Sequence, residues 1–344
     1  MEKHILDNSK IRLSKIGLGT WAIGGSNWAH GWGPQEDADS ISAIHRALDL
    51  GINWIDTAPV YGLGYAEEII GRALRYRRSE CIIATKCGLV WQGENGKPFG
   101  NLHAKSIRKE AEDSLKRLGV DVIDLYQIHW PAPDKNIEEA WHTIADLIQE
   151  GKIRFGGVSN FNIQQLERLQ AIYPITSLQT PYNMLNRKAE KEIFNYCKSN
   201  GISLLIYSPM YSGLLSGEFT KERGKRLHKQ DWRKRHIRFR EPELGFVQVL
   251  NNQLGLIAKR NGCTMAQLAI AWALQSQEVS AAIVGARNFS QIEETIIADK
   301  LKFSVEDIIE IDAFIKEYKN LFAQRQFRRD RIARMLMNNM DERR

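Results

Sequence analysis

Four residues that can carry or transfer a proton follow one another along the chain: Asp56, Tyr61, Lys86 and His129. Asp56, Lys86 and His129 each stand at the end of a short apolar run, and Tyr61 follows the first run closely. Apolar runs of four to eight residues that stop at a polar group are typical of buried parallel strands. We therefore expect the ends of these strands to share one face and to bring the four side chains together.

The chemistry that these residue types could perform together is proton transfer. A free tyrosine has a pKa of about 10, and a nearby lysine ammonium lowers it. Lys86 would supply that cation and Asp56 would hold it charged and oriented, while His129 would hydrogen-bond a substrate oxygen. Tyr61 would then be the general acid that protonates the alkoxide formed when a hydride adds to a carbonyl. Taken singly, Asp56 could cap a turn, Lys86 could be solvated and His129 could be a core histidine.

Several motifs around these residues, in the same order and spacing, resemble those of the aldo-keto reductases. They lie at residues 51–62, 67–71, 122–131, 151–161, 207–209 and 284–287, followed by Gln291. The likeness runs from about Ile11 to Asp312. It is greatest to the bacterial branch of general-stress and inositol-cluster reductases, whose start is similar to residues 19–25.

Strand and helix patterns alternate along the chain and predict an α/β fold, a closed (β/α)₈ TIM barrel. An N-terminal β-hairpin turning at residues 7–9 would cap it. Strands are expected at residues 16–19, 54–56, 81–86, 122–129, 153–159, 177–180, 203–208 and 281–284. Helices are expected at residues 38–50, 66–74, 105–118, 137–150, 163–171, 189–199, 264–274 and from 290 onward. We expect one barrel domain, residues 1–318, and a C-terminal helical extension, residues 319–344.

The dinucleotide cofactor is implied by the resemblance rather than by a fingerprint, because no Gly-x-Gly-x-x-Gly follows a strand. The resemblance implies NADP(H) lying across the barrel mouth, with Ser159, Asn160 and Gln179 hydrogen-bonded to the carboxamide and Tyr207 stacked on the nicotinamide. A guanidinium at Arg287 could bind a 2′-phosphate, which favours NADPH over NADH. The other expected cofactor residues are Thr20, Trp21, Asp56, Ser208, Met210, Ser212, Gly213, Leu214, Arg233, Gly285, Gln291 and Glu294.

Two positions depart from the family pattern at the cofactor. Glu218 stands where relatives commonly place Lys, and Thr295 stands where many carry Asn. An acid at position 218 would not aid phosphate binding. Lys221, Arg223 or Arg233 could substitute for the missing lysine.

The substrate pocket is expected to be aromatic. Residues in loops at the expected barrel mouth are Trp21, Trp28, His30, Trp32, Val60, Trp91 and Trp130. Such walls suit hydrophobic or ring-bearing carbonyl compounds, and the face of a sugar would also fit them.

Composition indicates an ordinary globular protein that works in the cytoplasm, with 43% hydrophobic and 26% charged residues and no apolar segment of secretion or membrane type. The four cysteines have no metal-ligand spacing, so we expect reduced thiols and no metal. The net charge of +7 is concentrated in the extension, where eight basic residues face three acidic ones. This segment is expected to be a solvated helix, a cover over the barrel mouth or an oligomer contact, in a monomer or homo-oligomer, rather than a nucleic-acid or membrane site.

These observations favour an NADPH-dependent carbonyl reductase. Two alternatives stay open. One is an NADP(H)-sensing regulatory subunit on the same scaffold, and the other is an aldose or polyol dehydrogenase that works in the oxidative direction.

Overall fold

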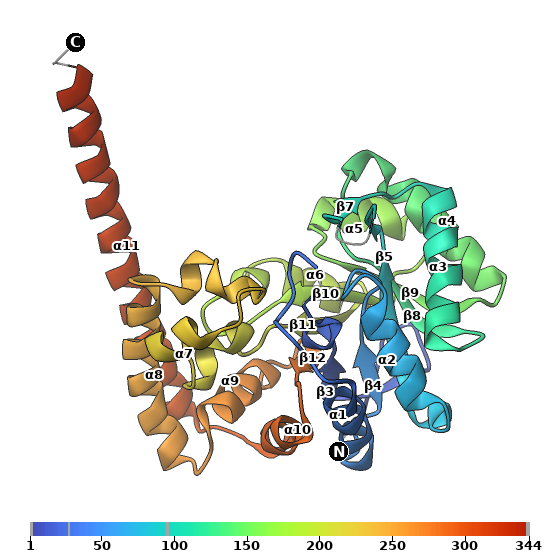
Figure 1. The fold of residues 1–344 in the computed structure, drawn as a ribbon, viewed down its shortest axis with the longest axis horizontal. Helices are drawn as coiled ribbons and strands as arrows, with labels where there is room; N and C mark the ends of the chain where they lie inside the picture. Colours follow the sequence, from blue (N-terminus) through green and yellow to red (C-terminus); the bar gives the residue numbers. More distant parts are fainter. Residues whose placement is uncertain (1–2, 27, 94–95, 342–344) are drawn as a thin grey trace.

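The computed structural model describes residues 3–26, 28–93 and 96–341, except for the side chains of 324–341. Eight parallel strands close into a barrel with the order β10-β11-β12-β3-β4-β5-β8-β9, and helices surround it (Figure 1). The strands are β3 (Ile16–Gly19), β4 (Trp54–Asp56), β5 (Ile82–Cys87), β8 (Ile123–Ile128), β9 (Ile153–Ser159), β10 (Ser177–Pro181), β11 (Ser203–Tyr207) and β12 (Val279–Gly285). The predicted (β/α)₈ barrel is confirmed.

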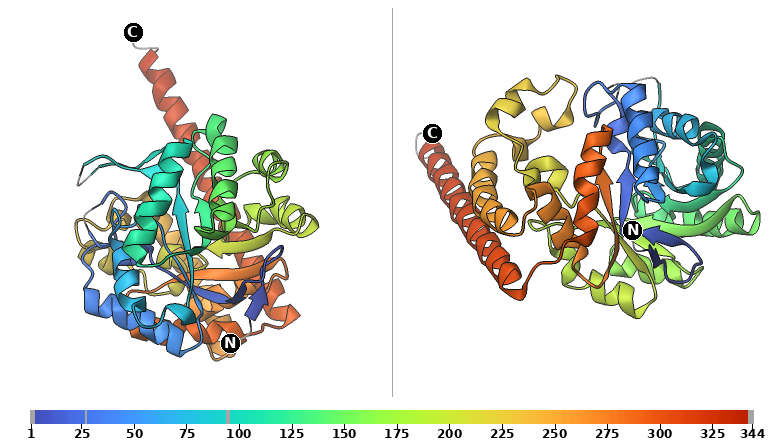
Figure 2. Two further views of the ribbon diagram at one scale, coloured as in Figure 1. Left: turned by 90° about the vertical axis from the view of Figure 1, so that its right-hand side faces the viewer. Right: turned by 90° about the horizontal axis from the view of Figure 1, so that it is seen from below.

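The helices lie on the outside of the barrel, where their apolar faces pack on the strands (Figure 2). Those that follow the strands in the barrel repeat are α1 (Asp37–Asp49), α2 (Tyr65–Leu74), α3 (Ala104–Leu118), α4 (Ile137–Gln149), α5 (Ile163–Gln170), α6 (Ile193–Ser199), α9 (Met265–Leu274) and α10 (Phe289–Thr295). A predicted helix at 189–199 begins later, since residues 188–190 form a separate 3₁₀ turn.

The inside of the barrel is layered because side chains in a strand alternate between its two faces. Trp54 of β4 and Leu125 of β8 lie in the lower, apolar layer, which the hairpin of β1 (Lys3–Ile5) and β2 (Arg12–Ser14) closes from below. Gly17 of β3 must be a glycine there, since a Cβ would lie 2.0 Å from the Trp54 ring. Two residues further along each strand, Asp56 and Gln127 enter the next, polar layer.

A β-hairpin and three helices are added to the barrel. A two-stranded hairpin, β6 (Leu89–Val90) and β7 (Phe99–Gly100), follows β5. The long loop after β11 contains α7 (Lys221–Arg226) and leads to α8 (Glu243–Arg260). Figures 1 and 2 show α11 (Val305–Asp341) lying along α8 and then leaving the body of the molecule.

Helix α8 was not predicted, and the predicted domain boundary lies inside α11. Two glycines, Gly245 and Gly255, interrupt the helical pattern of α8, because glycine is a poor helix former. Residues 318 and 319 belong to one continuous helix, so the proposed domain boundary coincides with no change of element. Within the described residues, no helix is long and apolar enough to cross a membrane.

Candidate active site

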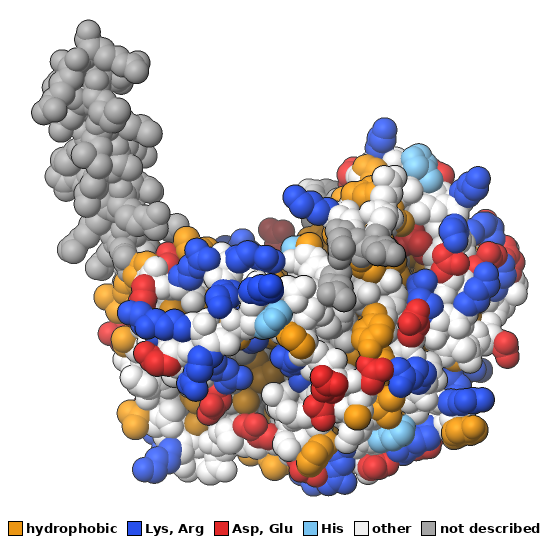
Figure 3. Space-filling model, in the orientation of Figure 1, with side chains coloured by type: hydrophobic (Ala, Val, Ile, Leu, Met, Phe, Trp, Pro, Cys, Tyr) orange, Lys and Arg blue, Asp and Glu red, His pale blue; other side chains and the backbone are white. Residues whose placement is uncertain are grey.

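A cavity of about 870 Å³ opens at the carboxyl ends of the barrel strands. Figure 3 shows the surface hollowed on this side, with hydrophobic side chains in the hollow and Lys and Arg side chains along one edge. Asp56, Tyr61 and His129 lie on its lining, and Lys86 is fully buried directly beneath. The strand ends thus bring the four residues together, as the sequence analysis expected.

Lys86 connects the other members of this group. Its ammonium donates to Asp56 Oδ1 at 2.6 Å, to the Thr57 carbonyl at 2.9 Å and to the Tyr61 hydroxyl at 3.4 Å. The three N–H bonds of an ammonium therefore each have an acceptor. The Tyr61 and His129 rings meet edge to face, with 5.9 Å between their centroids.

Asp56 is held from its other side by two amides that the sequence analysis did not assign to it. Gln179 donates to Asp56 Oδ2 at 2.7 Å, and Gln127 lies 3.4 Å from the same oxygen. The two amides are joined by a 3.3 Å hydrogen bond from Gln179 to Gln127. The amide nitrogen of Gln179, expected to face the carboxamide of a cofactor, is thus committed to the carboxylate.

The expected lowering of the Tyr61 pKa is wrong. Burial, and then the negative charge of Asp56, raise the pKa of the Tyr61 phenol well above its ordinary value. Lys86 lies 3.4 Å from the Tyr61 hydroxyl, but burial of the phenol outweighs this cation, and burial also lowers the pKa of Lys86 itself against the opposing charge of Asp56. Burial, and then the charge of Lys86, hold the pKa of His129 well below its ordinary value. At neutral pH the site therefore contains a protonated phenol and an uncharged imidazole.

Strained backbone gathers at one side of the cavity. Asn160, Ser208 and Ser212 have positive φ angles of 66°, 55° and 58°, which are uncommon for residues other than glycine and cluster at functional sites. Asn160 is also tied by its side chain, which accepts from the Tyr207 hydroxyl at 2.8 Å and donates to the His129 carbonyl at 3.1 Å. These contacts fix the Tyr207 ring at the wall of the cavity.

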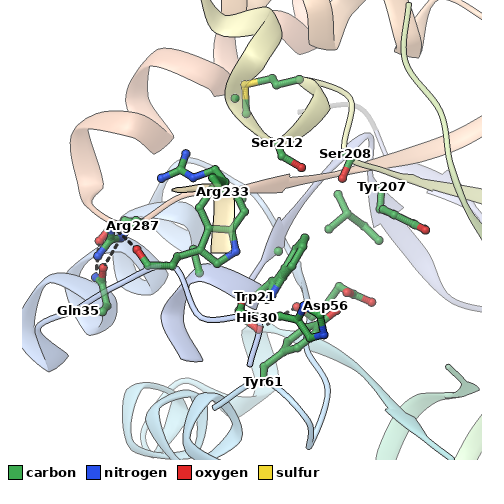
Figure 4. A pocket seen from close by; sticks show the side chains of 18 of the residues that line it. Trp21, His30, Gln35, Asp56, Tyr61, Tyr207, Ser208, Ser212, Arg233 and Arg287 are labelled. Atoms are coloured by element: carbon green, nitrogen blue, oxygen red, sulfur yellow. Dashed lines mark hydrogen bonds between the residues drawn. The ribbon is translucent and has the colours of Figure 1, made fainter. Parts of the chain in front are cut away.

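Two arginines lie at the far end of the cavity (Figure 4). Arg233 is paired with the buried Asp231, with contacts of 3.0 and 2.7 Å, and its guanidinium stands 4.2 Å from the centroid of the Trp32 ring. Arg287 follows β12 and contacts the loop between β3 and α1. Burial, and then the nearby charge of Arg233, lower the Arg287 pKa.

The loop after β11 crosses the cavity as a strap, residues 217–240. It is fastened to the loop after β3 by the Trp32–Asp231 bridge and by a 2.9 Å hydrogen bond from the Trp232 N–H to the Gly31 carbonyl. The Trp232 ring stacks on Trp21 with a centroid separation of 5.4 Å. Glu218 lies on the cavity, 3.9 Å from Arg223, so a neighbouring cation offsets the acid at the position where a lysine was expected.

The end of the cavity next to Tyr61 is aromatic and uncharged. Trp28, Val60 and Leu89 belong to one cluster with Tyr61, and Trp130 is 45% exposed at the rim. Burial, and then Arg235, lower the pKa of His30 in this wall. Trp28, which was expected at the barrel mouth, lines the cavity here.

Most residues expected to bind cofactor or substrate lie on the cavity. They are Thr20, Trp21, His30, Trp32, Asp56, Val60, Trp130, Ser159, Asn160, Gln179, Tyr207, Ser208, Met210, Ser212, Gly213, Arg233, Gly285, Arg287, Gln291 and Glu294. Leu214 does not line it, because its side chain is buried in a cluster with Phe219 and Phe239 of the strap. Trp91 does not line it either, because the β6–β7 hairpin reaches the cavity through Leu89 and Pro98 instead.

No group of His, Cys, Asp or Glu in the described part of the chain could hold a metal ion. The four cysteines are free thiols, three of them buried.

Comparison with known proteins adds independent findings. The family model described as "Aldo/keto reductase family" matches residues 15–316. The "Aldo-keto reductase YhdN" of Bacillus subtilis (strain 168) is 40% identical over 296 residues, which cover 85% of this chain and 87% of that protein. The "NADH-specific methylglyoxal reductase" of Escherichia coli (strain K12) is 35% identical over 323 residues, 89% of this chain and 96% of that protein. The structure of the glycerol dehydrogenase AKR11B4 from Gluconobacter oxydans superimposes with a TM-score of 0.82 at 35% identity, covering 92% and 96% of the two chains.

Proposed function

The chain belongs to the aldo/keto reductase family, and on this premise we propose that it is an NADPH-dependent reductase of aldehydes and ketones. The observation that carries the proposal is the Tyr61 hydroxyl. It lies on the cavity, 3.4 Å from the buried ammonium of Lys86 and beside the uncharged imidazole of His129. A protonated phenol in this position is a proton donor for an oxygen that becomes negative during reaction.

The cofactor would supply a hydride to the carbonyl carbon when bound. Tyr61 gives its proton to the carbonyl oxygen, and the Lys86 ammonium stabilises the phenolate that is left. Asp56 keeps Lys86 charged, and Gln127 and Gln179 keep the Asp56 carboxylate in place. His129 orients the carbonyl oxygen with a ring N–H. Solvent that reaches the cavity then returns a proton to Tyr61.

The residues present fit a dinucleotide. Tyr207 offers a fixed ring at the cavity wall for the nicotinamide, while Arg287 and Arg233 lie at the opposite end. Arg287 would contact a 2′-phosphate, which supports a preference for NADPH. The 35% identical relative whose name specifies NADH makes this preference a point to measure.

The natural substrate is proposed by class. The uncharged aromatic wall around Tyr61 suits a neutral carbonyl compound or a sugar. We propose that the protein acts in the cytoplasm on such small molecules, without nucleic acid or membrane as a partner. The resemblance of the fold to a glycerol dehydrogenase favours one second candidate, oxidation of a polyol by the same residues.

The test is to follow nicotinamide absorbance with NADPH and with NADH against aromatic aldehydes, ketones, dicarbonyls and aldoses, and in reverse with polyols and NADP⁺. Reduction that is faster with NADPH supports the proposal. Turnover only with polyols would replace it by the dehydrogenase. Tight NADPH binding without turnover on any substrate would favour the regulatory alternative.

A further inference from the structure

Gln35 and Arg287 are joined in both directions, although 252 positions separate them in the sequence. The Arg287 Nε–H donates to Gln35 Oε1 at 2.6 Å, and the Gln35 amide donates to the Arg287 carbonyl at 2.7 Å. Figure 4 shows this pair at the end of the cavity away from Tyr61 and Tyr207. Gln35 stands in the loop between β3 and α1, whereas Arg287 follows β12, so the pair connects the first and last units of the barrel.

Neutral oxygens are the hydrogen-bond acceptors of the Arg287 guanidinium. Besides Gln35, they are the carbonyl of Trp32 at 3.3 Å and the carbonyl of Pro34. No ion pair found among the described residues includes Arg287, and Asp231 is engaged by Arg233. Asp39 lies on the same cavity but is not paired with Arg287. The arrangement orients a half-buried cation without neutralising its charge.

An arginine has five N–H donors, so three contacts leave two for a ligand. Those two can form a bidentate contact with a phosphate, for which a planar guanidinium is well suited. A glutamate in place of Gln35 would have nearly the same shape, but it would pair with Arg287 and repel a phosphate dianion. It would also lose the hydrogen bonds that the amide donates to the Arg287 carbonyl and the Ser40 hydroxyl, which a methionine would lose as well. The neutral amide is therefore the feature that leaves the charge available.

We propose that Gln35 is a positioning residue that determines the preference for a 2′-phosphorylated dinucleotide, because it holds Arg287 with a neutral acceptor. The inference rests on the proposed NADP(H)-dependent function and adds a residue outside the motifs that carry the family resemblance.

The experiment measures dissociation constants for four ligands, NADPH, NADH, 2′,5′-ADP and 5′-AMP, by calorimetry on the full chain. The proteins are the wild type, Gln35→Glu, Gln35→Met and, for comparison, Arg287→Ala. Gln149→Glu is the matched control, since Gln149 is exposed at the end of α4 and the substitution adds the same charge. Binding of 2′,5′-ADP reports on the phosphate without requiring turnover.

Gln35→Glu is expected to weaken NADPH and 2′,5′-ADP by about tenfold or more, as loss of one charge-assisted contact would, and to change NADH and 5′-AMP by less than about threefold. Gln35→Met should act in the same direction but less. Equal weakening of NADPH and NADH would overturn the proposal, because Gln35 would then only hold two loops together. Unchanged NADPH binding in Gln35→Glu would overturn it as well. A wild type that binds NADPH and NADH equally would instead contradict the proposed cofactor preference itself.

Discussion

At the scale of single residues, the arrangement of the active site depends on how the Asp56 carboxylate is held. One oxygen receives the Lys86 ammonium and the other receives the amides of Gln179 and Gln127. Buried charges need such partners, since an unpaired carboxylate in this layer would be costly. The position of Asp56 in turn fixes Lys86 beside Tyr61.

Gln127→Leu should therefore lower kcat without weakening the cofactor. Loss of a hydrogen bond to a buried charge costs about 1 to 2 kcal/mol, so we expect kcat to fall by about fivefold to thirtyfold. Steady-state kinetics on a carbonyl substrate and the Kd for NADPH check this expectation. An unchanged kcat would show that Lys86 and Gln179 position Asp56 without Gln127.

The sequence predicted the four ionisable residues but not this support. Asp56, Lys86 and His129 were visible because each ends an apolar run. Gln127 lies in β8, two positions before His129, so strand alternation alone places its side chain inside the barrel. Gln179, which binds the same Asp56 carboxylate, comes from β10. Contacts between segments distant in sequence, like the pair of Gln35 and Arg287, cannot be deduced from local patterns.

At the scale of elements, the barrel strands were predicted to within about two residues, because buried parallel strands are short, apolar and bounded by polar groups. No helix or strand was predicted between residues 208 and 264, so the strap was expected only as part of a loop. The strap is held in place by Trp232 and Asp231, which contact a loop about 200 positions earlier in the sequence. No local sequence pattern predicts such a contact.

Trp232→Ala should loosen the strap. Removal of the ring eliminates its stacking on Trp21 and its contact with Phe239, so cofactor should leave faster and its Kd should rise by about tenfold. Stopped-flow fluorescence of NADPH release measures this change. Trp91→Ala is the matched control, since Trp91 does not line the cavity. Equal release rates in both variants and the wild type would contradict a closing role for the strap.

A second element, α3, anchors the start of the loop after β5. Glu110 accepts from the Gly88 N–H at 2.9 Å, and burial is the main cause that raises its pKa to about 7. Because the folded protein then binds the proton more tightly than the unfolded chain, stability should be fully present below pH 4.5 and fall as pH rises through 7.

Glu110→Gln should remove this dependence, since an amide has no proton to lose. The fall in the wild type is of the order of 3 kcal/mol. Urea unfolding at several pH values between about 5 and 8 measures the free energy of unfolding of both proteins. The curves should converge at low pH and separate at high pH in favour of the glutamine. Parallel curves would mean that Glu110 titrates as an ordinary exposed acid.

At the scale of the whole molecule, α11 lies along α8 and then runs away from the barrel (Figure 1). Phe322 meets Phe246 and Tyr318, with ring centroids 6.2 Å apart in both pairs. No residue of 305–323, the part of α11 whose side chains are described, lines the cavity. The expected basic and apolar contacts of the extension beyond residue 323 lie outside the described side chains.

Removal of residues 319–344 should leave catalysis intact. We expect kcat and the Kd for NADPH to stay within about twofold of the wild type, because the truncation reaches none of the residues that line the cavity. Light scattering on both proteins tests whether the extension is an oligomer contact. A large loss of kcat without a change of molar mass would show that the extension covers the barrel mouth.

The most direct test of the proposed function compares the wild type with Tyr61→Phe, which removes only the hydroxyl beside Lys86. The rate at which NADPH reduces a carbonyl substrate should fall by about 10²- to 10⁴-fold, the usual contribution of a positioned proton donor, while the Kd for NADPH stays nearly unchanged. If turnover persists, or if turnover and cofactor binding fall together, Tyr61 is not the proton donor and the proposed mechanism is wrong.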